Sequence, residues 1–290
     1  MLKKNVLLVV NPVSGGFDKD EFVEATRDFI NNNDFNLVVY RTTGHDDVVG
    51  IQNMYETSQP YRIIVAGGDG TLKLVGEAMA GKDIICGILP VGSSNGLAVE
   101  LDLIKTLDEN LEIALRHDYV EIDIVLINGK KSLHLSDIGL NAELIKNYKK
   151  SKVHGKWGYA LQVFRTLLHA KKPFRVHITA SNKVVDCEAR MIVMANAKKY
   201  GTGVVINPLG ILNDGKFELV IVKKMNLLIF CKIMMGIKMK KENEIEIIST
   251  NLAVIKTSFP VNFQIDGEFM GTENELNVSI ATEKIKVAVF

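Results

Sequence analysis

A glycine-rich loop with polar side chains is the first sign of chemistry in this chain. Gly67, Gly68, Asp69, Gly70 and Thr71 follow an apolar run and precede an amphipathic stretch. Glycines let backbone N–H groups approach an anion, and a helix N-terminus adds about half a positive charge. The loop therefore predicts phosphate binding, although an ordinary tight turn between a strand and a helix has the same composition.

Two more loops have a similar composition. Residues 11–16 (NPVSGG) and 90–96 (PVGSSNG) each follow an apolar run and offer amide and hydroxyl side chains beside glycines. The stretch 76–82 has the spacing of a P-loop, but it is followed by Asp83 and joins a helix to a strand. We therefore reject it, because the mechanism needs a strand, then the loop, then a helix. Three phosphate-compatible loops at one sheet edge are stronger evidence than one.

Two acidic turns lie late in the chain. Asp266, Gly267 and Glu268 stand between short strand-like runs, and Asp214 stands between Asn213 and Gly215. Both read first as hairpin turns. The functional interpretation of the first is a general base for a hydroxyl group. The functional interpretation of the second is a carboxylate at a metal ion.

The first part of the chain alternates apolar runs with amphipathic stretches, which predicts a parallel sheet with helices on both faces. In such sheets ligands bind beyond the carboxyl ends of the strands, so the loops should line one crevice. The strands are expected at 5–10, 37–40, 62–66 and 84–89, and the helices near 18–32, 45–56, 71–80 and 105–116.

From about residue 121 the apolar pattern changes to period two, which predicts a mainly antiparallel β-sandwich. We expect a first domain at 1–124 and a second at 125–282, with the strand near 283–290 returning to the first. Helices are expected near 155–171 and 225–240. Strands are expected at 121–127, 131–138, 174–180, 184–195, 216–222, 245–256, 261–265, 275–280 and 284–290.

The composition is that of an ordinary globular protein. The 290 residues are 47% hydrophobic and 24% charged, which excludes a disordered, collagen-like or coiled-coil chain. Three cysteines without paired spacing give no disulfide framework and favour a reducing compartment. The longest apolar stretch, 225–239, is interrupted by Lys232 and Lys238, so we expect no membrane span and a cytoplasmic protein.

The formal net charge of +1 hides an uneven distribution. Residues 1–125 hold 10 basic and 20 acidic residues, and residues 126–290 hold 25 basic and 14 acidic ones. Stretches 144–185 and 219–241 contain no acidic residue. An anionic membrane surface fits such stretches, because each basic residue near it contributes about 1 kcal/mol. A solvated basic face stays open as an alternative, whereas no recognised motif supports nucleic acid binding.

Taken in order, these motifs resemble the diacylglycerol kinase catalytic-domain family, which includes bacterial lipid kinases and, more distantly, sphingosine and ceramide kinases. The resemblance covers nearly the whole chain. It implies an α/β nucleotide domain, a β-sandwich domain and an active site in the cleft between them. It also implies ATP-dependent phosphorylation of a lipid hydroxyl. The resemblance rests on residues 11–16, Thr42, 67–71, 89–98, 203–219 and 266–268.

The resemblance assigns roles residue by residue. Glu268 would be the proton acceptor, with Asp266 orienting it or sharing its role. Asp214, with the carbonyl groups of Ile211 and Lys216, would hold a structural Mg²⁺, and Asp69 and Asp123 would hold a catalytic Mg²⁺ through water. The positions that match ATP contacts are Asn11, Pro12, Val13, Ser14, Gly15, Thr42, Gly67, Gly68, Asp69, Gly70, Thr71, Leu72, Lys73 and Ser93.

Two departures from the family pattern leave alternatives open. Gly96 stands where many diacylglycerol kinases have Asp, and Lys73 and Leu74 replace a frequent Asn-Glu pair. A soluble-substrate kinase such as an NAD kinase, or a non-catalytic nucleotide- or lipid-binding protein, therefore remains in view. Diacylglycerol, undecaprenol, phosphatidylglycerol and sphingoid bases all present a hydroxyl, so the lipid is not named. A homodimer is left open, and we expect an enzyme of lipid metabolism at the membrane periphery.

Overall fold

The computed structural model describes residues 3–15, 19–92, 95–150, 173–181, 183–200, 203–224 and 244–290. The chain divides into two compact units, residues Met1–Ile122 with Thr282–Phe290, and residues Asp123–Ala281. The boundary expected from the sequence was 124/125, with a return near 283. The helices expected at 155–171 and 225–240 lie outside the described residues.

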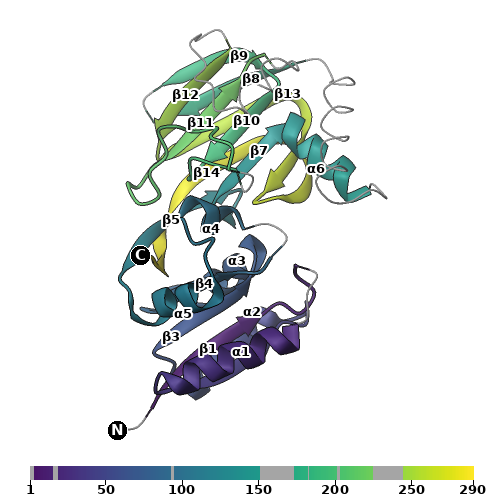
Figure 1. The fold of residues 1–290 in the computed structure, drawn as a ribbon. Helices are drawn as coiled ribbons and strands as arrows, with labels where there is room; N and C mark the ends of the chain where they lie inside the picture. Colours follow the sequence, from purple (N-terminus) through teal and green to yellow (C-terminus); the bar gives the residue numbers. More distant parts are fainter. Residues whose placement is uncertain are drawn as a thin grey trace. The chain divides into compact units, whose positions relative to one another are not determined.

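The first unit is built on a parallel sheet flanked by helices (Figure 1). The central strands pair in parallel in the order β2-β1-β3-β4. The elements are β1 (Lys4–Val10), α1 (Lys19–Asn32), β2 (Phe35–Arg41), α2 (Asp47–Ser58), β3 (Arg62–Gly67), α3 (Asp69–Ala78), β4 (Ile85–Pro90), α4 (Gly96–Glu100) and α5 (Leu107–Arg116). The expected α/β arrangement is confirmed.

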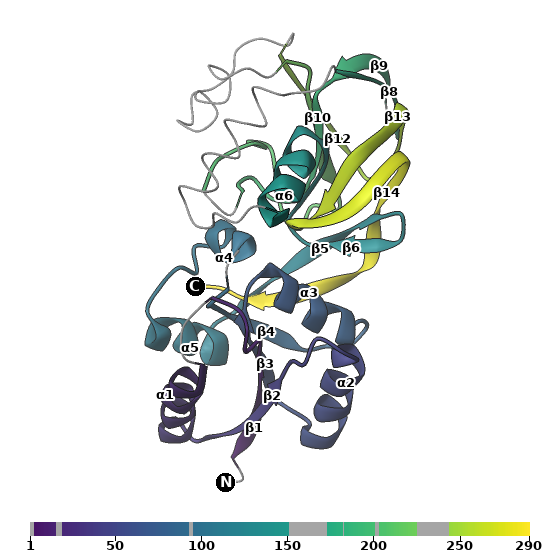
Figure 2. The ribbon, with the colours of Figure 1, turned by 90° about the vertical axis from the view of Figure 1, so that its right-hand side faces the viewer.

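Helices cover both faces of this sheet, with α1 and α5 on one side and α2 and α3 on the other (Figure 2). Strands covered on both faces become continuous apolar runs. This is why the last five residues of β1 and all of β3 are buried. The start of α5 is fixed by a capping box between Thr106 and Glu109.

The chain end completes this sheet. The last part of β14 (Glu268–Ala288) pairs in parallel with β4, with Lys286 opposite Ile85 and Val287 opposite Cys86. Val289 then donates its backbone N–H to the carbonyl of Asp118. The C-terminal strand therefore belongs to the first unit although it begins in the second.

The second unit is mainly antiparallel, as expected. Its pairs include β10–β11, β10–β7, β11–β12, β13–β7, β13–β8 and β13–β14. Its elements are β5 (Tyr119–Ile127, shared with the first unit), β6 (Lys130–Ser132), β7 (Leu135–Gly139), α6 (Leu140–Lys150), β8 (Phe174–Ala180), β9 (Val184–Ala189), β10 (Met191–Ala195), β11 (Phe217–Val222), β12 (Ile245–Thr250), β13 (Leu252–Ile265) and β14.

The core of this unit lies on both faces of β10 and β11. Ile192 and Phe217 belong to a large apolar cluster that also includes Val176 of β8. Val193 and Val220, one pleat away, belong to a second cluster on the opposite face. Alternate side chains of a strand point to opposite faces, so these strands can be apolar throughout.

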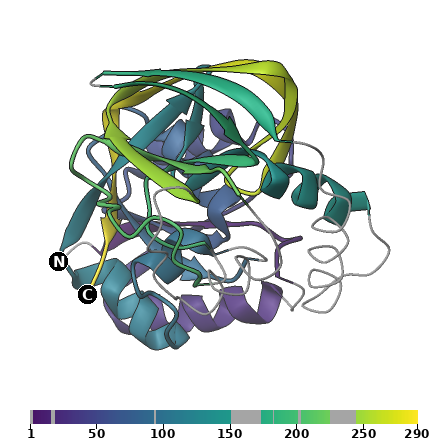
Figure 3. The same cartoon turned by 90° about the horizontal axis from the view of Figure 1, so that it is seen from above.

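Strands β13 and β14 are long and bend along their length (Figure 3). Their register shifts between Lys256 and Val261 and again between Phe263 and Gln264. The sequence pattern predicted separate short strands here, because irregular positions interrupt the period-two signal. Helices α4 and α6 were not predicted. Within the described residues, no helix is both long and apolar enough to cross a membrane.

Candidate functional site

The ends of three parallel strands in the first unit are joined by backbone hydrogen bonds just past the strands. Asn11 donates its N–H to the carbonyl of Ala66 at 3.1 Å, and Thr42 donates to Val10 at 2.9 Å. The amide of Asn11 also approaches the hydroxyl of Thr71 at 3.5 Å. The prediction that the NPVSGG loop, Thr42 and the GGDGT loop lie at one edge of the sheet is therefore confirmed.

Asp69 connects the GGDGT loop to the loop after β4. Its carboxylate accepts hydrogen bonds from the backbone N–H groups of Gly96 at 2.8 Å and Leu97 at 3.0 Å, where α4 begins. Asp69 is only 7% exposed. The structure thus gives Asp69 a bridging role, and its predicted role towards a catalytic Mg²⁺ stays a prediction.

Close approach of these loops explains part of their glycine content. A Cβ atom at Gly92 would lie 2.3 Å from the backbone of Gly68, and one at Gly67 would lie 2.3 Å from the hydroxyl oxygen of Thr71. The amide of Asn95 holds the same turn by accepting from Gly92 and donating to Pro90. These glycines are therefore required for loop packing, in addition to any contact with an anion.

The loop that carries Thr42 is held by Asp47, which sequence reasoning missed. Asp47 accepts hydrogen bonds from the hydroxyl of Tyr40 at 2.9 Å and from the N–H groups of Thr43 and Gly44, both at 2.8 Å. Burial alone would raise the pKa of Asp47, but these hydrogen bonds lower it below its usual value. The N–H groups that Asp47 binds precede α2 instead of lying in its first turn, so the usual N-cap pattern would not have identified it.

The other residues with predicted ATP contacts differ in exposure. Pro12, Val13 and Gly15 are exposed, Ser14 and Lys73 are half-buried, and Leu72 is buried in the core. Ser93 lies outside the described residues. Lys19, which was not among the predicted residues, is 5% exposed and donates through Nζ to the carbonyl of Val91 at 3.3 Å. Burial lowers the pKa of its side chain.

In the second unit, the turn Asp266–Glu268 separates β13 from β14, and its two carboxylates lie in different environments. Asp266 accepts hydrogen bonds from the hydroxyl of Ser132 at 2.9 Å and from the N–H groups of Leu133 at 3.0 Å and His134 at 3.1 Å. Glu268 is exposed, and its carboxylate has no hydrogen bond or ion pair within the described part of the chain. Asp266 therefore anchors the turn, and Glu268 is available for proton transfer.

Hydrogen bonds to the buried residue Asp123 hold the loop that contains Asp214. Asp123 is fully buried and accepts a hydrogen bond from the N–H of Gly215 at 2.6 Å, while its own N–H donates to Leu212 at 2.7 Å. Asp214 is exposed and accepts through one oxygen from the N–H of Lys216 at 3.0 Å. Asp123 therefore supports the loop that contains Asp214. The predicted roles of Asp214, Ile211 and Lys216 at a structural Mg²⁺, and of Asp123 at a catalytic Mg²⁺, stay predictions.

The donor set of this loop fits Mg²⁺. The ion typically takes one or two carboxylates, carbonyl oxygens and several waters. The exposed carboxylate of Asp214 and the nearby carbonyls of Ile211 and Lys216 are such donors. Within the described residues no group of three or more His, Cys, Asp or Glu side chains is placed to hold a metal. A site here would therefore depend on water and carbonyl ligands.

Two buried amides around this loop were not predicted as functional. Asn196 donates to the carbonyl of Asp123 at 2.8 Å, and Asn207 donates to the carboxylate of Glu218 at 2.7 Å. Glu218 also accepts from the hydroxyl of Ser249 at 2.9 Å. Asn207 and Glu218, both within residues 203–219, are thus joined to each other and to Ser249.

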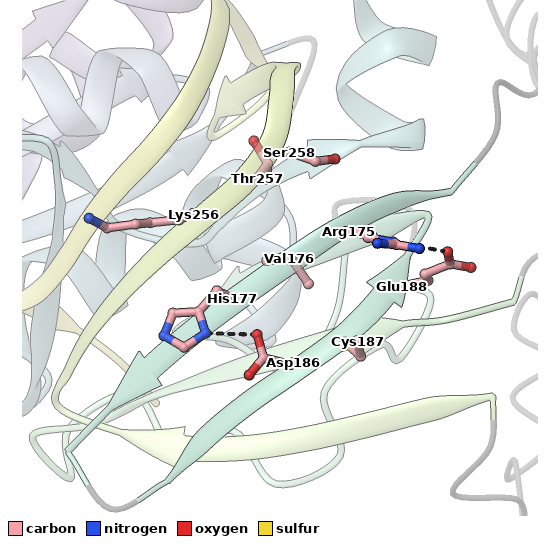
Figure 4. A pocket seen from close by; sticks show the side chains of 9 residues that line it. All are labelled: Arg175, Val176, His177, Asp186, Cys187, Glu188, Lys256, Thr257 and Ser258. Atoms are coloured by element: carbon pink, nitrogen blue, oxygen red, sulfur yellow. Dashed lines mark hydrogen bonds and ion pairs between the residues drawn. The ribbon is translucent and has the colours of Figure 1, made fainter.

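A hollow on strands β8, β9 and β13 lies elsewhere in the second unit and contains none of the predicted site residues (Figure 4). Its polar side chains pair across the strands. His177 contacts Asp186 at 2.8 Å, and Arg175 lies 3.8 Å from Glu188. Because these groups partner each other on an open face, the hollow carries no functional assignment.

Two family profiles match the chain. The profile described as the diacylglycerol kinase catalytic domain matches residues 5–127. The profile described as the YegS C-terminal NAD kinase beta sandwich-like domain matches residues 137–289, which is more than half of the chain. Their order agrees with the α/β and antiparallel units of the fold.

Individual proteins agree with these matches. The chain is 29% identical to a diacylglycerol kinase of Bacillus subtilis (strain 168) over 221 residues, covering 72% of this chain and 71% of that one. It is 28% identical to the lipid kinase YegS of Escherichia coli (strain K12) over 163 residues, which is 54% of this chain and 54% of YegS. The match to YegS thus spans only about half of its length.

A solved structure has the same fold. The crystal structure of a putative diacylglycerol kinase from Bacillus anthracis str. Sterne superimposes with a TM-score of 0.79 at 24% identity, covering 99% of this chain and 97% of that one. This likeness shows the fold, and the two profile matches show the family. The chain belongs to the diacylglycerol kinase catalytic-domain family with a YegS-type C-terminal domain, a family of phosphotransferases that use an alcohol group as acceptor.

Proposed function

We propose that this protein is an ATP-dependent lipid kinase, which transfers the terminal phosphoryl group of ATP to a hydroxyl group of a lipid. Family membership supports a kinase, and the relatives named above are lipid kinases. Diacylglycerol is the first acceptor to test, because it is named for the Bacillus subtilis relative.

The observation that carries the proposal is the difference between the two carboxylates of the turn. Asp266 is occupied by hydrogen bonds from Ser132, Leu133 and His134, so it is suited to holding the turn. Glu268 is exposed and without a partner among the described residues, so its carboxylate can accept a proton. A general base must reach its substrate in this way, and it contributes typically about 10²–10⁴-fold to the rate.

The nucleotide would bind to the loops of the first unit. Backbone N–H groups of residues 67–71, at the N-terminus of α3, would face the phosphates, with Asn11 and Thr42 beside them. Asp214 with the carbonyls of Ile211 and Lys216 would hold a structural Mg²⁺ ion. A catalytic Mg²⁺, held through water by Asp69 and Asp123, would neutralise negative charge at the phosphates. On this proposal the reaction would use the loops of one unit and Glu268 of the other.

The protein's part in the reaction is positioning and proton transfer. The lipid hydroxyl loses its proton to the carboxylate of Glu268 as its oxygen bonds to the terminal phosphorus of ATP. The bond from that phosphorus to the bridging oxygen breaks, and ADP leaves. The products are a phosphorylated lipid and ADP, and the proton on Glu268 returns to solvent.

The basic stretches 144–185 and 219–241 would bring the enzyme to an anionic membrane surface from the cytoplasm. Only parts of them lie within the described residues. Of these, Lys183 and Lys223 both pair with Glu246 at 2.6 Å, whereas Lys224 is exposed. The membrane contribution would therefore come from the other basic residues of the two stretches.

A screen of ATP consumption tests the proposal. The wild-type protein with Mg²⁺ is offered diacylglycerol, undecaprenol, phosphatidylglycerol and a sphingoid base in detergent micelles, and NAD in solution. Turnover with a lipid and not with NAD is the expected result. Turnover with NAD alone would make the protein a soluble-substrate kinase, and no turnover with any acceptor would favour a non-catalytic nucleotide- or lipid-binding protein.

A further inference from the structure

A buried amide and a buried carboxylate lie directly behind the turn that carries Glu268. Gln264 of β13 is 1% exposed and stands opposite Asp137 of β7, which is fully buried, in the antiparallel pairing of the two strands. Gln264 donates through Nε2 to the Oδ2 atom of Asp137 at 2.5 Å. Buried polar groups of this kind are costly unless their hydrogen bonds are made.

The other end of the same amide holds the turn. The Oε1 atom of Gln264 accepts a hydrogen bond from the N–H of Gly267 at 2.7 Å. An ionised carboxylate can only accept, so the amide must present its NH₂ group to Asp137 and its oxygen to Gly267. Asp137 therefore fixes which way the Gln264 amide points.

Two successive residues of the turn adopt left-handed backbone conformations. Asp266 has a φ of 47° and Gly267 a φ of 85°. Asp and Gly adopt this region more readily than most residues, and the pair is typical of a tight hairpin turn. Hydrogen bonds from residues 132–134 to Asp266 hold one side of the turn, and Gln264 holds the other. Glu268 follows immediately, so its direction depends on both.

Asp137 extends the network to helix α6. Its Oδ2 atom also accepts a hydrogen bond from the side-chain amide of Asn141, in the first turn of that helix, at 2.6 Å. Its Oδ1 atom is buried and has no hydrogen-bond partner among the described residues. A chain of hydrogen bonds thus runs from α6 through Asp137 and Gln264 to Gly267.

We infer that Gln264 is a positioning residue for the candidate base: held in one orientation by Asp137, it fixes the turn that aims Glu268. The inference rests on the proposed function. Positioning errors of about 1 Å can reduce turnover about 100-fold, so a residue without substrate contact can control the rate.

The experiment compares Gln264→Leu with Thr250→Val. Both remove a buried polar group of the second unit, but the hydroxyl of Thr250 bonds, within the described residues, only with Ser181 and Leu252. With Gln264→Leu we expect kcat to fall at least about tenfold, an unchanged KM for ATP, and faster hydrogen exchange of the Gly267 amide. Thr250→Val should change neither kcat nor that exchange. A folded Gln264→Leu protein with wild-type kcat would overturn the inference.

Exchanging the amide of Gln264 and the carboxylate of Asp137 provides a second test. Gln264→Glu alone sets two carboxylates against each other and should lower kcat strongly at neutral pH. Adding Asp137→Asn restores a donor and an acceptor in exchanged places, so the double variant should regain most of the kcat lost. A double variant no more active than Gln264→Glu would count against the network.

The exchange measurement separates this inference from the proposed function. If the wild-type protein phosphorylates no acceptor, the proposed function fails. The hydrogen-exchange rate of the Gly267 N–H then still tests whether Gln264 holds the turn. An unchanged rate in Gln264→Leu would overturn the inference. If the kinase is active and exchange at Gly267 is unchanged, only the inference fails.

Discussion

The carboxylate of Asp69 accepts a hydrogen bond from the backbone N–H of Gly96 at 2.8 Å. This contact joins the GGDGT loop to the loop after β4, 27 residues further along the chain. In the sequence, Gly96 stands where many members of the family have Asp, so one expected carboxylate is absent from this loop. In the structure the same position contributes a backbone donor, so the two loops are held together without a second acid.

Replacing Asp69 by Asn should therefore loosen the nucleotide loops. The amide can accept from only one of the two N–H groups of Gly96 and Leu97, and hydrogen bonds to charged groups contribute about 1.5–3 kcal/mol. We expect a Tm lower by several degrees and a raised KM for ATP, measured by thermal unfolding and steady-state kinetics. Asp28→Asn on the exposed face of α1 is the matched control. Wild-type values for Asp69→Asn would show that the bridge is dispensable.

Asp137 should make stability depend on pH. Burial raises its pKa from 3.8 to about 6, so between these values the unfolded chain loses the proton while the folded protein keeps it. The folded state is therefore destabilised as pH rises through this window, by up to about 3 kcal/mol for a shift of this size. Below pH 3.8 both states are protonated and the effect vanishes.

Urea unfolding of the wild type and of Asp137→Asn, from pH 4 to pH 7, measures this contribution. The variant cannot ionise, so its stability relative to the wild type should increase steadily up to about pH 6 and then level off. The difference cancels the titration of other carboxyl groups. A difference that stays constant across the range would mean that Asp137 does not titrate there.

Removing the carboxylate of Asp214 should abolish stabilisation by Mg²⁺. A ligand that binds only the folded state stabilises it by about 2.7 kcal/mol at 100 times its dissociation constant. We expect millimolar Mg²⁺ to raise the Tm of the wild type and of the control Asp186→Asn, an exposed carboxylate on β9. Asp214→Ala should not respond. An equal Mg²⁺ response in Asp214→Ala would remove this loop as the metal site.

Charge reversal in the first basic stretch should weaken membrane binding. Lys171→Glu with Lys172→Glu replaces two positive charges by two negative ones. The lost positive charges alone, at about 1 kcal/mol each, should lower the affinity about 30-fold, and repulsion of the new carboxylates should lower it further. Co-sedimentation with phosphatidylglycerol vesicles measures it, and added salt should weaken the wild type. Lys130→Glu, exposed and outside both stretches, is the control. Lys183 and Lys223 are unsuitable, because their loss would also break pairs with Glu246. Binding unaffected by salt and by these changes would end the membrane proposal.

The first unit was well predicted because its signal is local. Each strand there is an apolar run followed by small or polar residues, and the expected strand at 62–66 differs from Arg62–Gly67 by one residue. The second unit was predicted as mainly antiparallel, but its long strands were divided at their bulges. Helix α4 has five residues, too short for a helical period, and α6 directly follows β7 without a turn signal between them.

Sequence motifs identified the candidate residues but did not show which of them hold a loop in place and which are free to react. Asp266 and Glu268 differ only in what surrounds them, and the groups that occupy Asp266 come from residues 132–134, more than 130 positions away. Asp123 similarly supports the Asp214 loop through Gly215. Such long-range hydrogen bonds leave no spacing in the sequence, so only the fold could reveal them.

The most direct test of the whole account is Glu268→Gln. Phosphoryl transfer from radiolabelled ATP to the lipid acceptor identified by the screen is measured beside ATP binding. The amide keeps the size of the side chain but cannot accept the proton, so turnover should fall at least about 100-fold while ATP affinity stays at the wild-type value. Full lipid phosphorylation by Glu268→Gln would contradict the assignment of Glu268 as the general base.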